Sequence, residues 1–396
     1  MSAWPVRRAA VESIPLDVAF GRVLAADVAA PEDVPPFRRS RVDGYAVIAA
    51  DVAGASAAAP ARLTLVGDVN MGRPAPRSLA RGQTMRIPTG GALPPGADGV
   101  AMMEDASVVC DIVEVRDAFE CETNVTAAGA DVRAGARLFQ SGTVLRAPAL
   151  GLLAACGLAG VDVYRRPAVG LLLTGDELVA PGEPLAPGQI RDVNRYALSA
   201  AIWAAGFAPV PYPKVPDDRQ AFSAALTRAL GECDAVVISG GSSVGERDYT
   251  PEVVAAAGAP GVLVHGILAK PGRPTLLGLV ADQPIVGLPG NPVSALVMWE
   301  AVGKPMCLRM FDKQDKTLPW RAVLDAGIDV DPSYEHRVPV RLLRGDDGLR
   351  AQPLVGTSAQ MHILAFADAV VIVPLGTRHV GAGALVDAWP LSSALR

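Results

Sequence analysis

Three apolar runs constrain the fold of this chain more than any other feature of its sequence. They are AVGLLLTG (168–175), DAVVISGG (234–241) and QPIVGLPG (283–290). Each is too continuously apolar to be a strand with one face in water, and helical patterns lie between them over residues 195–205 and 218–230. Buried strands that alternate with amphipathic helices indicate a parallel sheet covered by helices on both faces. We expect this α/β region to extend from residue 165 to residue 312.

The sequence on either side of this region has a different pattern of apolar residues and turns. Residues 16–28 favour a helix, which the loop PEDVPPF (31–37) ends. Short β-like runs separated by Gly/Pro turns then continue to about residue 126. After Met310 short strands return, including a predicted hairpin with GDDG (345–348) as its turn. The expected fold class is therefore α/β plus β, with more than one domain.

The composition excludes several classes of protein. Half of the residues are hydrophobic, which is enough for a folded core, and 40 glycines with 34 prolines are too many for a coiled coil or a helical solenoid. A net charge of −5 argues against binding to duplex nucleic acid, which requires a basic surface. No segment has the pattern of a signal peptide or of a membrane-spanning helix. Five scattered cysteines and four histidines favour neither a disulfide framework nor a zinc site. We expect a cytoplasmic protein, in which any metal is a hard cation held by oxygen atoms.

The loops that follow the three apolar runs are the most informative part of the sequence for function. They are TGDE (174–177), SGGSSVGERDYTPE (239–252) and GLPGNPVS (287–294). Ligands of open α/β sheets bind beyond the carboxyl ends of the strands, where glycine-rich backbone and helix N-termini approach an anion. These loops predict a phosphate site. For any one of them alone, an ordinary turn into a capped helix remains the alternative.

Charged side chains gather around the same predicted edge. The acids are Asp176, Glu177, Asp192, Asp217 and Asp248. Several carboxylates facing a phosphate require a bridging cation, for which Mg²⁺ is the usual choice, while helix capping or a solvated face is the alternative for each acid. Asp217 is the strongest candidate for a plain helix cap. Lys270 and Arg273 lie on a Pro/Gly turn and suit phosphate or oxyanion binding, or are simply exposed turn charges.

Three earlier segments combine polar residues with tight turns. They are SRVDGYAV (40–47), RIPTGGALPPGAD (86–98) and GADVRAG (129–135). The Asp43–Gly44 pair is a hairpin signal. Spacing alone assigns no chemistry to these segments.

Taken in order, these motifs resemble those of the molybdopterin molybdenumtransferase family, the MoeA proteins and the gephyrin E domain. The matching segments span nearly the full chain: LDVAFGRVLAADV, PPF, VDGYAV, RIPTGGALPPGADGVAMMED, GADVRAG, RRPAVGLLLTGDELV, PGQIRDVNRY, ISGGSSVGERDYT, KPGRP and GLPGNPVSALV. The resemblance implies Mg²⁺-dependent insertion of molybdate into adenylylated molybdopterin with release of AMP. It also implies a homodimer whose active site lies between the α/β domain of one subunit and domains of the other.

The resemblance further implies four domains in each subunit. The first is a discontinuous linker and dimerisation domain formed by residues 1–33 with 127–164, and the second is a β-rich insert at 34–126. The α/β molybdopterin-binding domain covers 165–312, and a C-terminal β domain covers 313–396.

The resemblance and the loop chemistry together assign three sets of site residues. The catalytic set is Asp43, Asp131, Glu177, Asp217, Asp248 and Lys270. The substrate-binding set is Thr89, Thr174, Gly175, Asp192, Ser239, Gly240, Gly241, Ser242, Ser243, Gly245, Arg273, Pro289 and Asn291. The Mg²⁺ ligands are Asp176, Glu177 and Asp248. Residues 239–245 would take the pterin phosphate and the pyrophosphate.

This sequence also departs from the family pattern. Arg38, Arg39 and Arg41 replace uncharged or acidic residues beside Asp43, and the helix that usually precedes residue 16 is shortened. Ala130 stands where a Glu is common, and Gly266 stands where many members have a second lysine. The C-terminal domain matches weakly, so its basic site residue is either Arg337 or Arg341.

Two other functions remain open at the level of sequence. A paralogue could bind molybdopterin or deliver it to an enzyme without turnover. Alternatively, the chain could carry out the adenylyl transfer, although adenylyltransferases resemble only residues 165–312. A nicotinamide dehydrogenase is disfavoured, because no G-x-G-x-x-G follows a strand. An adenylyltransferase and a molybdoenzyme or its chaperone are candidate partners, and the sequence does not distinguish molybdate from tungstate.

Overall fold

A computed structural model of the chain describes residues 4–240, 249–313, 315, 317–346 and 348–391. The chain divides into two compact units. The larger unit contains residues 1–12, 21–25 and 163–396, and the smaller unit contains residues 13–20 and 26–162. The finer division into four domains stays a prediction. Within the described residues, no helix combines the length and the apolarity needed to cross a membrane.

The larger unit contains the predicted α/β sheet, with strands in the order β16-β13-β17-β21-β20-β18. The strands are β13 (Ala168–Leu173), β16 (Ala208–Pro211), β17 (Ala235–Ser239), β18 (Pro260–His265), β20 (Leu276–Val280) and β21 (Gln283–Leu288). The three apolar runs become β13, β17 and β21, which lie side by side and parallel, as predicted. The sheet is not wholly parallel, since β20 runs antiparallel to both of its neighbours.

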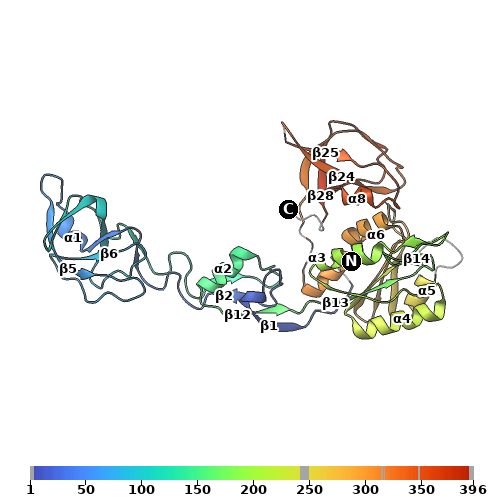
Figure 1. Cartoon of the computed structure of the whole chain (residues 1–396), viewed down its shortest axis with the longest axis horizontal. Coiled ribbons are helices and arrows are strands. Elements are labelled where there is room, and N and C mark those ends of the chain that lie inside the picture. Colours follow the sequence, from blue (N-terminus) through green and yellow to red (C-terminus); the bar gives the residue numbers. More distant parts are fainter. Residues whose placement is uncertain (1–3, 241–248, 314, 316, 347, 392–396) are drawn as a thin grey trace. The chain divides into compact units, whose positions relative to one another are not determined.

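Helices cover both faces of this sheet, as predicted (Figure 1). Helices α3 (Asn194–Ala204) and α6 (Pro292–Met298) pack together on one face, and α4 (Arg219–Glu232) and α5 (Thr250–Ala257) on the other. Under α4 and α5, Leu172 and Ile238 of the sheet pack with Phe222 and Leu226. The chain continues through the π-helical turn Trp299–Gly303, α7 (Lys304–Leu308) and the 3₁₀ turn Arg309–Phe311.

The cap of α4 corrects one prediction. Asp218, not Asp217, is the N-cap residue, and its Oδ1 accepts a hydrogen bond from the backbone N–H of Ala221 at 2.8 Å. The two consecutive aspartates are equivalent in sequence, but it is Asp218, with extended backbone, that directly precedes the first helical residue. Asp217 is therefore free of the capping role.

The C-terminal part of the larger unit is a sheet in the order β19-β24-β25-β22-β28-β26, closed by pairing of β24 with β26. Its strands are β19 (Ala269–Lys270), β22 (Trp320–Leu324), β24 (Glu335–Gly345), β25 (Gly348–Pro353), β26 (Ala369–Val373) and β28 (Leu385–Pro390). The predicted hairpin is confirmed, since β24 and β25 pair antiparallel up to Gly345 and Gly348. Strand β23 (Ile328–Asp329) pairs with β27 (His379–Val380), and α8 (His362–Ala365) precedes β26.

The smaller unit contains the predicted β-rich segment, a sheet in the order β7-β4-β6-β5-β9-β8. Its strands are β4 (Gly44–Val47), β5 (Ala61–Asp68), β6 (Gln83–Ile87), β7 (Gly99–Met102), β8 (Ala106–Val109) and β9 (Ile112–Val115), with α1 (Ala49–Val52) and the 3₁₀ turn Met103–Asp105. The hairpin predicted at Asp43–Gly44 is wrong. Gly44 opens β4, whose partners β6 and β7 come much later in the chain.

Short paired segments complete the fold. Strand β1 (Val11–Pro15) pairs with β12 (Gly160–Tyr164), β2 (Val28–Ala29) with β11 (Arg137–Phe139), β3 (Arg39–Ser40) with β10 (Val125–Thr126), and β14 (Leu178–Val179) with β15 (Ile190–Arg191), while α2 covers Ala147–Ala155. The helix predicted over residues 16–28 is wrong, because only the 3₁₀ turn Leu16–Val18 forms. Gly21 has a φ of +72°, and Leu24 forms a β-bridge with Val163. Neither feature is compatible with a helix.

Candidate functional site

The carboxyl ends of β13, β17 and β21, with the described residues that directly follow them, lie together at one edge of the α/β sheet. The backbone N–H of Thr174 donates to the carbonyl of Ser239 at 3.2 Å. The Ser239 hydroxyl donates to the carbonyl of Pro289 at 3.1 Å. The structure thus brings together Thr174, Ser239 and Pro289, as predicted from three separate motifs. The predicted residues Gly241, Ser242, Ser243, Gly245 and Asp248 lie outside the described residues.

Glycine is required at two positions of this edge. Gly240 has a φ of +100°, and a Cβ atom there would lie 2.4 Å from the carbonyl oxygen of Thr174. Gly175 has a φ of +138°, and a Cβ atom there would lie 2.7 Å from Oε2 of Glu177. The carboxylate of Glu177 therefore folds back over Gly175, next to the end of β13. Both glycines let an oxygen atom of the protein approach the backbone closely, and their positive φ values favour glycine at this edge.

Two of the predicted acids lie next to each other at this edge. The backbone N–H of Asp176 lies 3.4 Å from Oδ2 of Asp217, and that of Asp217 lies 3.5 Å from Oδ1 of Asp176. The Lys214 ammonium group donates to the carbonyls of Asp176 and Leu178 at 3.2 and 3.1 Å. Both aspartates are exposed, so their side chains are open to solvent and to a ligand.

Asp192, another of the predicted acids, has a structural role. Asp192 is buried, and its Oδ1 accepts a hydrogen bond from the backbone N–H of Arg195 at 3.0 Å, at the start of α3. Asp192 also lines a polar cavity of about 710 Å³, together with Tyr196 and Lys214. Over the described ranges, no three His, Cys, Asp or Glu side chains are grouped closely enough to hold a metal ion.

Lys270 is held by residues of the segment that directly precedes β24. Its Nζ lies 3.0 Å from Oδ2 of Asp331 and 4.1 Å from the centre of the Tyr334 ring. Strand β19 places it there by pairing with β24, opposite His336. The sequence carries no signal for this cluster, because its members are about 60 residues apart in the chain. Nearby, Arg273 is exposed.

The Lys270 cluster has a predictable dependence on pH. The backbone N–H of Ser333 and the Lys270 ammonium group lower the pKa of Asp331 to about 2. A lowered carboxyl pKa stabilises the fold above the unfolded value of about 3.9, and this contribution is lost as the pH falls toward 2. We therefore expect the difference in Tm between wild type and Asp331→Asn to be constant above about pH 4 and to shrink below it. A difference that does not change with pH in thermal melts would contradict this assignment.

Three predicted residues lie in the smaller unit. Oδ1 of Asp43 accepts a hydrogen bond from the backbone N–H of Thr89 at 2.8 Å, which joins two motifs that the sequence left separate. Both residues are exposed, as is Asp131, whose backbone N–H donates to the carbonyl of Val34 at 2.9 Å. The Asp43–Thr89 contact is thus local to the smaller unit, and Asp131 lies on a separate turn.

The arginines beside Asp43 differ in their surroundings. Arg38 forms an ion pair with Glu122 and donates to the carbonyl of Ala97 at 3.3 Å, so its guanidinium group has a structural role. Arg39 and Arg41 are exposed on either side of buried Ser40. These two arginines are the ones that remain open to a ligand.

The other departures from the family pattern also have a place in the structure. Gly266 has a φ of +83°, a conformation in which a lysine would be strained. Ala130 is exposed. Arg337 pairs with Glu335 at 2.8 Å, whereas Arg341 is exposed on β24. Of the two candidate basic residues, Arg341 is the one whose side chain is open to solvent.

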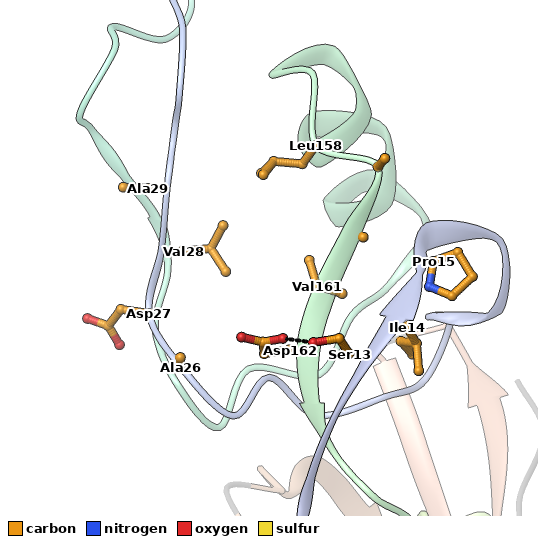
Figure 2. A pocket seen from close by; sticks show the side chains of 12 residues that line it. Ser13, Ile14, Pro15, Ala26, Asp27, Val28, Ala29, Leu158, Val161 and Asp162 are labelled. Carbon is orange, nitrogen blue, oxygen red and sulfur yellow. Dashed lines mark hydrogen bonds between the residues drawn. The ribbon is translucent and has the colours of Figure 1, made fainter.

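A further cavity, of about 610 Å³, lies in the smaller unit (Figure 2). It is lined by residues 13–15, 26–29 and 158–162. Its polar side chains have local partners, since Ser13 donates to Asp162 and Asp27 accepts from the backbone N–H of Ser141 at 2.9 Å. No predicted site residue lines this cavity, so the edge of the α/β sheet remains the candidate functional site.

Comparisons with known proteins agree with this arrangement. A model of the MoeA N-terminal region (domains I and II) matches residues 2–157, a probable molybdopterin binding domain matches 170–309, and the MoeA C-terminal region (domain IV) matches 321–391. Molybdopterin molybdenumtransferase 2 of Mycobacterium tuberculosis is 34% identical over 96% of this chain and 95% of its own length. The molybdopterin molybdenumtransferase of Bacillus subtilis is 31% identical over 95% and 89%.

Solved structures give the same result. The molybdopterin biosynthesis MoeA protein of Pyrococcus horikoshii superposes with a TM-score of 0.86 at 33% identity, covering 98% of this chain and 96% of that one. The match therefore extends over both units and is not confined to the α/β region. This chain belongs to the molybdopterin molybdenumtransferase family.

Proposed function

We propose that this chain inserts molybdate into the dithiolene of adenylylated molybdopterin and releases AMP in a reaction that depends on Mg²⁺. The observation that carries the proposal is the meeting of Thr174, Ser239 and Pro289, at the carboxyl ends of β13, β17 and β21, at one sheet edge. Gly175 and Gly240, both with positive φ, give this edge glycine-rich backbone of the kind that binds phosphate groups. The exposed acids Asp176 and Asp217 lie at the same edge.

The acids at this edge fit Mg²⁺ by their chemistry. Mg²⁺ prefers oxygen ligands and is commonly held by one or two carboxylates, with water and substrate phosphates completing its shell. We propose Asp176, Glu177 and Asp248 as its ligands, while adjacent Asp217 adds negative charge that favours a cation. When bound, the ion would neutralise charge on the pyrophosphate.

Two cationic residues also belong to the proposed function. Lys270 and Arg273 would contact phosphate or molybdate as positive charges. Asp43, Thr89 and Asp131 belong to the proposal as residues that the family resemblance implies for the same reaction. The homodimer and the cytoplasmic location belong to the same proposal. So do the partners, an adenylyltransferase that supplies the substrate and a molybdoenzyme or chaperone that takes the product.

The test is a reaction of the purified chain with adenylylated molybdopterin, molybdate and Mg²⁺, with AMP followed by chromatography. We expect AMP release that requires molybdate and Mg²⁺ together. Binding of the nucleotide without AMP release would indicate a delivery paralogue instead. Consumption of ATP in the absence of molybdate would indicate the adenylyl transfer step.

A further inference from the structure

A buried asparagine connects two of the three loops at the candidate site. Asn194, the first residue of α3, is 8% exposed. Its Nδ2 donates to Oγ of Ser239 at 2.9 Å and to the carbonyl of Gly290 at 2.7 Å. The Ser239 hydroxyl in turn donates to the carbonyl of Pro289. One amide group therefore holds the ends of β17 and β21 together.

The side chain is needed because the backbone ladder ends at this point. Strands β17 and β21 pair up to Ser239 and Leu288. The next residue, Pro289, has no N–H and cannot continue the ladder. The Asn194 amide continues the connection beyond it, to Gly290. Only a donor can serve here, because the Gly290 carbonyl is an acceptor.

The third loop is tied to the same point by close packing. Gly240, next to Ser239, lies against Thr174 so tightly that a Cβ atom would clash with the Thr174 carbonyl. Two buried atoms at this junction, Oδ1 of Asn194 and Oγ1 of Thr174, have no hydrogen-bond partner within the described part of the chain. A buried polar atom that lacks a partner destabilises a fold. Residues selected only for stability would not be expected to keep two of them together, which points to a functional junction.

We propose that Asn194 is a positioning residue that sets the separation of Ser239 from Pro289–Gly290, and thereby the binding of the substrate's phosphate groups. This inference rests on the proposed function and deepens it. Asn194 acts through the two loops and is not itself a catalytic residue.

The same sheet supplies a matched control at its opposite edge. Gln283, at the amino end of β21, is also 8% exposed. Its Nε2 donates to the carbonyls of Leu230 and Cys233 at 3.0 and 2.8 Å. Gln283 therefore makes the same kind of double amide contact as Asn194, away from the candidate site.

The experiment compares Asn194→Ala with Gln283→Ala in the full chain. Thermal melts are expected to show a similar loss of Tm, since each variant removes two hydrogen bonds from a buried amide. For AMP release, Asn194→Ala is expected to raise the KM for adenylylated molybdopterin at least about tenfold, which corresponds to about 1.4 kcal/mol, with a smaller change in kcat. Gln283→Ala is expected to keep KM within about twofold of the wild-type value, well below the tenfold rise expected for Asn194→Ala. If Asn194→Ala does not fold, Asn194→Ser is measured in its place.

The measurements distinguish failure of this inference from failure of the proposed function. If wild type releases AMP but both variants shift KM equally, or neither shifts it, Asn194 is only structural and this inference is overturned while the proposed function stands. If wild type releases no AMP, the proposed function fails as an enzyme activity. The Kd for adenylylated molybdopterin then decides the inference, which requires weaker binding in Asn194→Ala than in Gln283→Ala. Absence of binding by wild type would overturn both.

Discussion

Replacing Glu177 with Gln is expected to lower kcat/KM for AMP release by about 100-fold or more. The Glu177 carboxylate folds over Gly175 at the end of β13, beside the pair formed by Asp176 and Asp217. An amide keeps the shape of this side chain but removes the charge that would hold Mg²⁺ against the substrate. Loss of one electrostatic contact of this kind typically lowers kcat by about 10²–10³. The measurement is the initial rate of AMP release at saturating and at low substrate concentrations.

The matched control is Asp282→Asn, which removes a carboxylate at the opposite edge of the same sheet. Asp282 forms an exposed ion pair with Arg7 at 2.9 Å, and such pairs contribute about 0–1 kcal/mol. Its variant should react at nearly the wild-type rate. Equal losses in both variants would mean that net charge, and not the loop after β13, governs the reaction. No loss in Glu177→Gln would place the site elsewhere.

Replacing Gly44 with Ala is expected to destabilise the smaller unit by about 3 kcal/mol, at the upper end of the usual range for overpacking. A Cβ atom at this position would lie 1.9 Å from the carbonyl oxygen of Ala101 and 3.2 Å from a methyl group of Val100. Because the obstructing atom is backbone, within the β4–β7 ladder, no change of rotamer relieves the clash. The sheet itself must move.

Two spectroscopic signals separate this effect from a general loss of stability. All five tryptophans, at positions 4, 203, 299, 320 and 389, lie in the larger unit. In urea titrations, Gly44→Ala should shift the far-ultraviolet circular dichroism transition of the smaller unit while leaving the fluorescence transition in place. Gly54→Ala is the control, since no atom lies within 4 Å of its Cβ position. An unshifted dichroism transition in Gly44→Ala would refute the steric argument.

Patterns that depend on burial could be predicted from the sequence. Continuous apolar runs must be buried on both faces, so β13, β17 and β21 were correctly identified as neighbouring parallel strands. The family resemblance added Asp43 and Thr89, which spacing alone could not connect. The 2.8 Å contact between them shows that these motifs do meet.

Features that depend on distant partners could not be predicted. Asp43–Gly44 reads as a hairpin turn, yet Gly44 is required by Ala101, more than 50 residues later. Residues 16–28 have a helical pattern, but Leu24 bridges to Val163. Asp331 was not recognised, because only the folded sheet brings it to Lys270. In each case a tertiary contact decided the local structure.

We expect substrate to bind at the carboxyl edge of the α/β sheet, and a crystal structure with adenylylated molybdopterin tests this most directly. We expect phosphate oxygens against the loops that begin at Thr174, Ser239 and Pro289. The crystal structure would also show whether Arg39 and Arg41 face the ligand. A ligand bound instead in the cavity between residues 13–15 and 158–162, with those loops unoccupied, would contradict the account.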